Sequence, residues 1–577
     1  MTAPLPPLTD PALPPGAALL AEGRAMARDW TLGPCPFLHE QGVTSEAAYK
    51  TRTAATGRIM QHAHIGFRST ARTTEAMARL VDETARRGVR IDRFGVTLDW
   101  TMGYPPDRRR GATRGTGIVL EGPEDFARIT HATPAAAHFG DFMLGLPGAL
   151  HNTRAAIAAG ATAIGNLGQY FTFRLPYWDD DVATTCATLR ALGLIAAQPA
   201  TVLVHSNIDD GFAGLFLDVT SALGMVLIEK HIVEDLIGAR ASFCFGHHYT
   251  NPMTRTAFHA ALARLTDTPG TMIYGNTVAY RAEPAANYAS LSNYLLADLI
   301  ALGRHASGHA VTPIPVTENQ RIPDVDEILD AQLFAARLAA HAPAQAALVD
   351  TAAIDAVADR LIAGARRFAA AALSGLAGLG VDTADPAALM LAIRRLGARR
   401  MERLWGLGPL QGETRRPLQP ADWAEELDHM ARDWAARQPC RAPGLRVAIG
   451  TTDVHEHGAY LVRRALQGIG AEVTEAGVAI DAETLVARAV ETGADAIAVS
   501  TYNGVGLGYA RAVRAELSRR GLATPVMIGG LLNEIPRDSN SGLPVDVTAE
   551  IRATGAIPCA SLDDMLPVLA ALQPVTS

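Results

Sequence analysis

Residues 445–470 read LRVAIGTTDVHEHGAYLVRRALQGIG, and this stretch decides the fold of the C-terminal part of the chain. The apolar run RVAIG is followed by a polar loop and then by apolar residues at helical spacing. Four further apolar runs alternate with helical patterns, namely AEVTEAG (471–477), ADAIAVS (494–500), PVMIGG (525–530) and AIPCA (556–560). Five buried strands with helices between them predict a flavodoxin-like, or Rossmann-like, α/β domain over residues 445–577, with ligands beyond the carboxyl ends of its strands.

The polar loop after the first strand places an imidazole near a carboxylate. Asp453 precedes His455 by two residues, so its carboxylate can accept the second ring N–H and fix the tautomer, as carboxylates do behind metal-ligating histidines. Gly458 would let the backbone pass close to a large ligand. The residues alone are equally compatible with a loop histidine that its neighbour satisfies at the start of a helix.

The spacing D-x-H-x-x-G in this context resembles the cobalamin-binding domain of mutases and of methionine synthase. The resemblance implies that His455 is the lower axial ligand of cobalt and the catalytic metal ligand, that Asp453 orients it, and that His457 points elsewhere. Tyr502 stands where the family has leucine. The other residues implied to contact the cofactor are glycines and hydroxyl residues near the strand ends: Gly458, Ser500, Thr501, Gly504, Gly506, Gly529 and Gly530.

Composition excludes several classes of protein. The 577 residues are 48% hydrophobic with a net charge of −8, which favours neither disorder nor a nucleic-acid or anionic-membrane partner. Lysine occurs only at Lys50 and Lys230, so an enzyme that anchors pyridoxal by a Schiff base is disfavoured. The 5 cysteines lack a C-x-x-C pair, and no signal peptide or membrane segment is recognised. We therefore expect a cytoplasmic protein without a disulfide framework, iron–sulfur cluster or zinc site.

The rest of the chain falls into three predicted segments. Residues 1–50 are expected to form an N-terminal arm that opens on a proline-rich stretch. Residues 51–340 alternate strand-like runs, such as TVLVHSN (201–207), GMVLIEK (224–230) and ASFCFG (241–246), with alanine-rich amphipathic stretches. This alternation over nearly 300 residues predicts a (β/α)8 TIM-like barrel. Residues 341–438 show only helical patterns and are predicted to be a helical linker region.

The barrel segment resembles, more faintly, the large subunit of glutamate (methylaspartate) mutase, through the stretch AIAAGATAIGNLGQYFTFRLPYW (156–178). The family's catalytic glutamate falls on Leu167, and its three substrate-binding arginines are not preserved. The resemblance implies an adenosylcobalamin-dependent isomerase that acts by a radical mechanism on a small acid or acyl substrate other than glutamate, here as a homodimer. Glu318 is implied at the adenosyl ribose.

Polar and aromatic residues that follow the strand-like runs should face the open end of the barrel. The candidates for substrate contact are His62, His64, Arg68, Arg110, Gln169, Tyr170, Arg174, Tyr177 and His205. Two alternatives stay open: a corrinoid-dependent methyltransferase, and a cobalamin-binding sensor that is not an enzyme. The helical region leaves room for the first, while the sensor would be expected to carry a DNA-binding helix-turn-helix.

Overall fold

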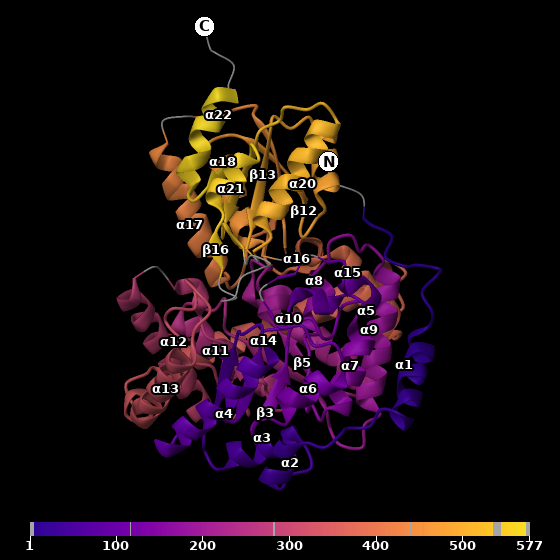
Figure 1. The fold of residues 1–577 in the computed structure, drawn as a ribbon, viewed down its shortest axis with the longest axis vertical. Coiled ribbons are helices and arrows are strands. Elements are labelled where there is room, and N and C mark those ends of the chain that lie inside the picture. Colours follow the sequence, from indigo (N-terminus) through magenta and orange to yellow (C-terminus); the bar gives the residue numbers. More distant parts are fainter. Residues whose placement is uncertain are drawn as a thin grey trace. The chain divides into compact units, whose positions relative to one another are not determined.

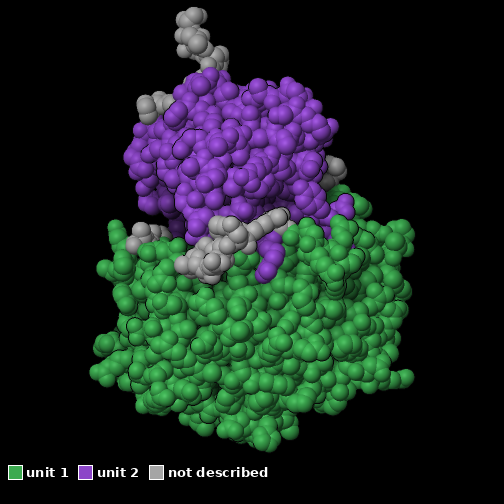
Figure 2. Space-filling model, viewed as in Figure 1, with its two compact units in different colours: residues 1–112, 117–172, 180–423 green, residues 113–116, 173–179, 424–577 purple. Residues whose placement is uncertain are grey.

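The computed structural model describes residues 5–112, 114–115, 117–280, 283–412, 414–438, 441–453, 455–502, 504–534 and 544–572. The chain divides into two compact units, coloured separately in Figure 2. Unit 1 comprises residues 1–112, 117–172 and 180–423, and unit 2 comprises residues 113–116, 173–179 and 424–577. Within the described ranges, every helix is too short or too polar to span a membrane.

Unit 1 is built around eight parallel strands that close into a barrel (Figure 1). The strands are β1 (Met60–Ile65), β2 (Arg93–Val96), β3 (Ala136–Phe139), β4 (Ala163–Ile164), β5 (Leu203–Asn207), β6 (Arg240–Phe245), β7 (Met272–Ile273) and β8 (Ala310–Val311). The main helices that follow them are α4 (Thr70–Arg86), α6 (Pro123–Thr130), α7 (Ala149–Ala158), α9 (Asp181–Ala196), α10 (Val219–Lys230), α11 (Pro252–Leu265), α12 (Pro284–Arg304) and α13 (Val325–Ala346). The predicted (β/α)8 barrel is confirmed.

One expected strand is wrong. The run GMVLIEK at 224–230 lies in α10 and not in the barrel wall. Most residues of this helix are buried, including Leu223, Met225 and Ile228. A helix that is covered on several sides shows no polar face, so its short apolar run cannot be told from a buried strand by periodicity.

The described part of the expected N-terminal arm contains the α-helices α1 (Gly16–Ala25) and α2 (Pro36–Gln41) and the start of α3 (Glu46–Ala55). Helix α1 packs on α9 so closely that a Cβ on Gly23 would lie 2.2 Å from the carbonyl oxygen of Arg190. Helix α3 begins at Ser45, whose side chain accepts a hydrogen bond from the N–H of Ala48. This helix places Glu46 and Lys50 in fully buried positions beneath the barrel strands.

The predicted helical region is divided between the two units. Helices α14 (Thr351–Gly378), α15 (Pro386–Leu396) and α16 (Ala398–Trp405) belong to unit 1, with a short hairpin of β9 (Leu410–Gln411) and β10 (Thr414–Arg415). Helix α14 packs on α10, where a Cβ on Gly224 would lie 2.6 Å from the Phe368 ring. Most of α17 (Asp422–Arg437) belongs to unit 2, where Trp434 joins the core and donates to Asp563 at 2.7 Å.

Unit 2 contains a five-stranded parallel sheet in the order β12-β11-β13-β14-β17, as predicted for a flavodoxin-like domain. Its strands are β11 (Arg446–Thr451), β12 (Glu472–Gly477), β13 (Ala496–Thr501), β14 (Val526–Gly530) and β17 (Ile557–Cys559). Its helices are α18 (His457–Gly468), α19 (Ala482–Glu491), α20 (Gly506–Arg519), α21 (Thr548–Ala553) and α22 (Leu566–Leu572). A second antiparallel hairpin joins β15 (Asn533–Glu534) to β16 (Val545–Asp546).

Strand register brings the three sequence elements of the predicted cofactor site to one edge of this sheet. Thr451, at the end of β11, pairs with Ser500 of β13, which in turn pairs with Gly529 of β14. Each of the three strands ends within two residues of these positions. The loops that follow the strands therefore emerge side by side at the carboxyl edge, where ligands bind in folds of this class.

Candidate functional site

The loop after β11 holds His455 through Asp453. The Asp453 carboxylate accepts from His455 Nδ1 at 2.6 Å and from the backbone N–H of His455 at 3.0 Å. Because Nδ1 is the donor in this bond, the lone pair of the neutral ring lies on Nε2. The His455 side chain is 45% exposed, whereas that of Asp453 is 8% exposed. A buried carboxylate thus orients an imidazole that faces outward.

Asp453 is itself fixed by the neighbouring strand. Its second oxygen accepts from the Thr452 hydroxyl at 2.9 Å and from the backbone N–H of Tyr502 at 2.8 Å. Burial alone would raise the pKa of Asp453, but the hydrogen bonds from His455 and Tyr502 lower it to about 2. The carboxylate is therefore ionised at neutral pH. The Tyr502 ring also packs on His455, with centroids 4.3 Å apart.

Around Asp453 and His455, the edge of the sheet contains glycines at positions that have no space for a side chain. A Cβ on Gly458 would lie 2.5 Å from Ser500 Oγ, and a Cβ on Gly529 would lie 2.8 Å from the Cys559 carbonyl oxygen. Gly530 has φ +112°, and a Cβ at this position would clash with the Thr501 carbonyl oxygen, 2.1 Å away. An outward-facing imidazole with a carboxylate behind it, beside glycine backbone, suits a planar metallated ligand such as a corrinoid.

At the barrel of unit 1, polar side chains gather beyond the ends of β3, β4 and β5. Asn166 Nδ2 donates to Asp210 Oδ2 at 2.9 Å, and Gln169 Nε2 donates to Asp141 Oδ1 at 3.3 Å. Burial, with the carboxylates of Asp141 and Asp209 beside it, raises the pKa of Asp210 well above its usual value. Repulsion between these neighbouring carboxylates favours the protonated form of Asp210.

Further groups continue this cluster after β6, β7 and β8. Asp209 accepts from the backbone N–H groups of His247 at 2.9 Å and His248 at 3.2 Å. Burial raises the pKa of Glu318 to about 7, and burial together with Glu318 raises the pKa of Tyr274 well above its usual value. The mouth of the barrel therefore carries carboxyl groups that keep or exchange protons near neutral pH, which suits positioning and acid–base work.

Residues 445–557 match the B12 binding domain family. The C-terminal part of the chain is thus similar to B12 binding domains. The match covers the Asp453–His455 loop, β13 with Ser500 and Thr501, and the Gly529–Gly530 pair. This match supports the cobalamin cofactor expected from the sequence, but it does not distinguish the adenosyl form from others.

The resemblance to a cobalamin-dependent mutase is also borne out. The chain is 26% identical over 150 residues to a curated protein named ethylmalonyl-CoA mutase from Cereibacter sphaeroides, which covers 26% of this chain and 21% of that protein. The chain thus spans about a fifth of the length of this relative. A solved cobalamin-binding protein from Desulfitobacterium hafniense DCB-2 is 16% identical, covering 26% of this chain and 71% of the other with a TM-score of 0.20.

With the exception of Glu318, the predicted cofactor residues lie at the carboxyl edge of the five-stranded sheet of unit 2. Gly504 has φ +71° in the loop after β13, and Gly506 begins α20. Thr501 accepts a hydrogen bond from Thr452 at 2.9 Å and so ties β13 to the His455 loop. Glu318 belongs to unit 1, where it follows β8. Its assignment to an adenosyl ribose stays a prediction.

The predicted substrate residues of the barrel fall at different depths. His64 and Gln169 lie at the mouth, where His64 Nε2 bonds Thr97 Oγ1 at 2.9 Å. His62 and His205 are fully buried lower in the barrel. Their roles as substrate contacts stay predictions.

The other predicted contacts lie in helices or loops. The Tyr170 hydroxyl bonds Thr185 at 2.7 Å within the helical layer. Arg68 is half-buried and Arg110 is exposed. In unit 2, Arg174 Nη1 donates to the carbonyl of Phe173, and the 62% exposed Tyr177 donates its N–H to Asp481.

Several groups of the barrel site are absent from the predicted set. Asp141 directly follows the run AAAHFG (135–140), and Asp210 lies three residues after the run TVLVHSN; carboxylates in those places are a usable signal for the mouth of a barrel. Arg93, Glu46 and His138 gave no such signal, because each depends on which side chains meet inside the closed barrel. These three residues form a buried network with His62, described below.

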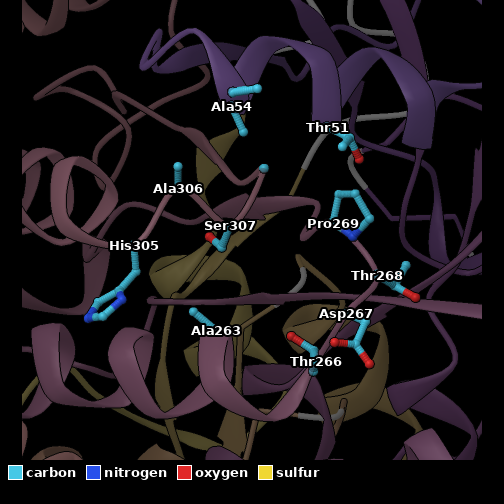
Figure 3. A pocket seen from close by; sticks show the side chains of 12 residues that line it. Thr51, Ala54, Ala263, Thr266, Asp267, Thr268, Pro269, His305, Ala306 and Ser307 are labelled. Atoms are coloured by element: carbon cyan, nitrogen blue, oxygen red, sulfur yellow. The ribbon is translucent and has the colours of Figure 1, made fainter.

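A surface pocket of about 450 Å³ lies at the other end of the barrel, where the chain enters β7 and β8 (Figure 3). Its lining includes Thr51 of α3, Pro269 before β7, and Ser307 before β8. None of the described residues around it belongs to the predicted site. Active sites of these barrels form at the carboxyl ends of the strands, so we assign this pocket no catalytic role.

The glycine edge of the B12-binding domain gives a first testable prediction. Gly530→Ala should destabilise this domain by about 1–3 kcal/mol, because φ +112° and the Thr501 carbonyl 2.1 Å from the new Cβ both oppose a side chain. Gly508→Ala is the matched control, since nothing lies within 4 Å of that helical Cβ position. Thermal unfolding of the full chain should show the control unchanged or stabilised. Equal stability of the two variants would contradict this packing.

Proposed function

We propose that this protein is an adenosylcobalamin-dependent mutase that rearranges the carbon skeleton of a small acid or acyl compound other than glutamate. The carrying observation is the Asp453–His455 pair at the edge of a B12-binding domain, on one chain with a closed barrel whose mouth is polar. The similarity to a protein named ethylmalonyl-CoA mutase supports the isomerase class. Partner domains decide among the uses of cobalamin, and a barrel with buried polar groups favours catalysis over sensing.

In this proposal, adenosylcobalamin would supply a carbon-centred radical when bound. His455 Nε2 would ligate the cobalt, because the Asp453 hydrogen bond keeps the proton on Nδ1. The hydrogen bonds from His455 and from the backbone N–H of Tyr502 keep Asp453 ionised, and the Thr452 hydroxyl helps to hold it in place. These groups set the position and basicity of the ligand and take no part in proton transfer.

The barrel would hold the substrate and exclude water. Asp210, whose raised pKa favours its protonated form, can donate a hydrogen bond to a substrate oxygen in that form, and Glu318 can hold or release a proton near pH 7. Arg109 donates to the carbonyl of Met102 and to Asn152. These hydrogen bonds engage the Arg109 guanidinium within the protein, which supports a substrate other than glutamate.

The full-length chain reconstituted with adenosylcobalamin or with methylcobalamin tests the proposal. Under anaerobic conditions, small acids and acyl thioesters are added and the samples are examined by electron paramagnetic resonance and product analysis. We expect a radical signal and an isomeric product with the adenosyl form alone. Methyl transfer without a radical signal would replace the mutase with a methyltransferase. Tight cobalamin binding with neither product would leave a cobalamin-binding sensor.

A further inference from the structure

A layer of histidines crosses the interior of the barrel. His62 of β1, His138 of β3 and His205 of β5 are each at most 2% exposed. The rings of His62 and His138 are 5.8 Å apart between centroids, and those of His138 and His205 are 4.3 Å apart. Alternate strands of such a barrel contribute the side chains of one layer, which are usually bulky and apolar. The presence of imidazoles in a layer that is usually apolar therefore indicates a chemical role for these side chains.

Arg93 of β2 fixes the tautomer of two of these histidines. Its Nη1 lies 3.3 Å from His62 Nδ1 and its Nη2 lies 3.1 Å from His138 Nδ1. A guanidinium has only donors, so both Nδ1 atoms must accept. Burial, reinforced by nearby positive charge, lowers the pKa of both rings well below the usual value, so both are neutral. The single proton of each ring then lies on Nε2.

Neither of these Nε2–H groups has a partner among the described residues. His62 Nε2 and His138 Nε2 are both fully buried without a hydrogen bond. Such orphaned donors are rare in folded proteins and indicate a missing ligand or water. Each Nε2 lies against a glycine that a larger residue could not replace: a Cβ on Gly95 would lie 2.6 Å from His62 Nε2, and one on Gly140 would lie 2.8 Å from His138 Nε2.

The charges beneath the layer favour an anion. Arg93 pairs with Glu46 at 2.6 Å, and Lys50 lies 3.8 Å from the same carboxylate. The Lys50 ammonium also donates to the carbonyls of Thr271 and Gly308, each at 3.0 Å. Arg93 and Lys50 therefore share one buried carboxylate, and the Arg93 guanidinium carries its positive charge to the histidine layer.

We propose that the Nε2–H groups of His62 and His138 bind one carboxylate group of a small organic acid, with Arg93 as the residue that positions both rings. This assignment rests on the proposed function in one respect, the expectation of a small-acid substrate. The two donors would fix the acid at the floor of the barrel, below the carboxyl groups of the mouth. The subsite explains how a carboxylate is held although the arginines of the glutamate mutase family are not preserved.

Nitrogen NMR of the full chain labelled with 15N-histidine tests the tautomer first. We expect His62 and His138 to be Nε2–H tautomers without any ligand, and Arg93→Met to abolish this fixed state in both rings. A merely structural arginine would leave the tautomers unchanged. An Nδ1–H tautomer at either residue in the unsubstituted protein would overturn the assignment.

Titration with propionate and succinate then tests the subsite. Either acid should shift the Nε2 resonances of both histidines, and His62→Phe or His138→Phe should weaken its binding about 10-fold or more, because each removes one donor to a charged oxygen. His259→Phe is the control, a buried histidine that bonds the His305 carbonyl instead; it should leave binding unchanged. Unshifted resonances with both acids would overturn the subsite. Acid binding without isomerisation would instead count against the proposed mutase alone.

Discussion

His455→Ala should abolish the coupling between a histidine nitrogen and cobalt in the electron paramagnetic resonance spectrum of the cobalamin-loaded protein. His455 is 45% exposed and its Nε2 carries the ring lone pair, because Asp453 accepts from Nδ1 at 2.6 Å. Losing the ligand should weaken cobalamin binding by more than the roughly 10–100-fold that follows loss of a residue behind a ligand. Turnover should fall with it.

Two companion variants make this result specific. His457→Ala changes the neighbouring histidine at the start of α18 and should keep the nitrogen coupling. Asp453→Asn should keep the coupling but weaken cobalamin binding about 10–100-fold, since an amide orients the ring less firmly than a carboxylate. Labelling histidine with 15N identifies the source of the coupling. Its persistence in His455→Ala would show that another residue holds the metal.

Glu46→Ala should destabilise the barrel by about 3–5 kcal/mol, the largest stability effect we expect in unit 1. Glu46 is fully buried and accepts from Arg93 at 2.6 Å and from Thr162 at 2.6 Å. Its removal leaves the Arg93 guanidinium buried without its counter-ion. Thermal and urea unfolding, followed by a signal from the barrel, would measure the loss.

Glu83→Ala is the control for this substitution. Glu83 pairs with Arg86 and Arg87 at the surface of α4, where ion pairs contribute about 0–1 kcal/mol. The contrast separates a buried network from a solvated one with the same residue types. A Glu46→Ala barrel as stable as the control would mean that the network relaxes or admits water at little cost.

The C-terminal domain is the part that sequence predicts best, because its signals are local. Each strand is a short apolar run, and Asp453 and His455 are two residues apart, so their hydrogen bond follows from the loop alone. The alignment of Thr451, Ser500 and Gly529 at one edge then follows from the strand order of a flavodoxin-like sheet. Here the family resemblance and the local chemistry agree.

The barrel interior is predicted less well because its contacts are long-range. Alternation along β1 places His62 and His64 on one face, and the strand direction places His64 nearer the mouth, but neither indicates which side chains of other strands they meet. His64 bonds Thr97 near the mouth, whereas His62 meets Arg93 in the centre. Glu46 was assigned to an N-terminal arm, and its contact with Arg93 exists only once the barrel has closed over α3. Such partners are separated by tens of residues in the chain, so the hydrophobic periodicity of the sequence does not reveal that they meet.

The buried position of Lys50 has a practical consequence for labelling. Only two lysines occur in the chain, and the Lys230 side chain is 25% exposed whereas that of Lys50 is fully covered. Burial, with the Arg93 charge beside it, lowers the pKa of Lys50 to about 7, and the same burial keeps its amine away from reagents in the folded protein. An acylating reagent should therefore modify Lys230 in the folded protein and Lys50 only when the barrel opens. The ratio of the Lys50-modified peptide to the Lys230-modified peptide, measured over time by mass spectrometry, would report the rate at which the barrel opens.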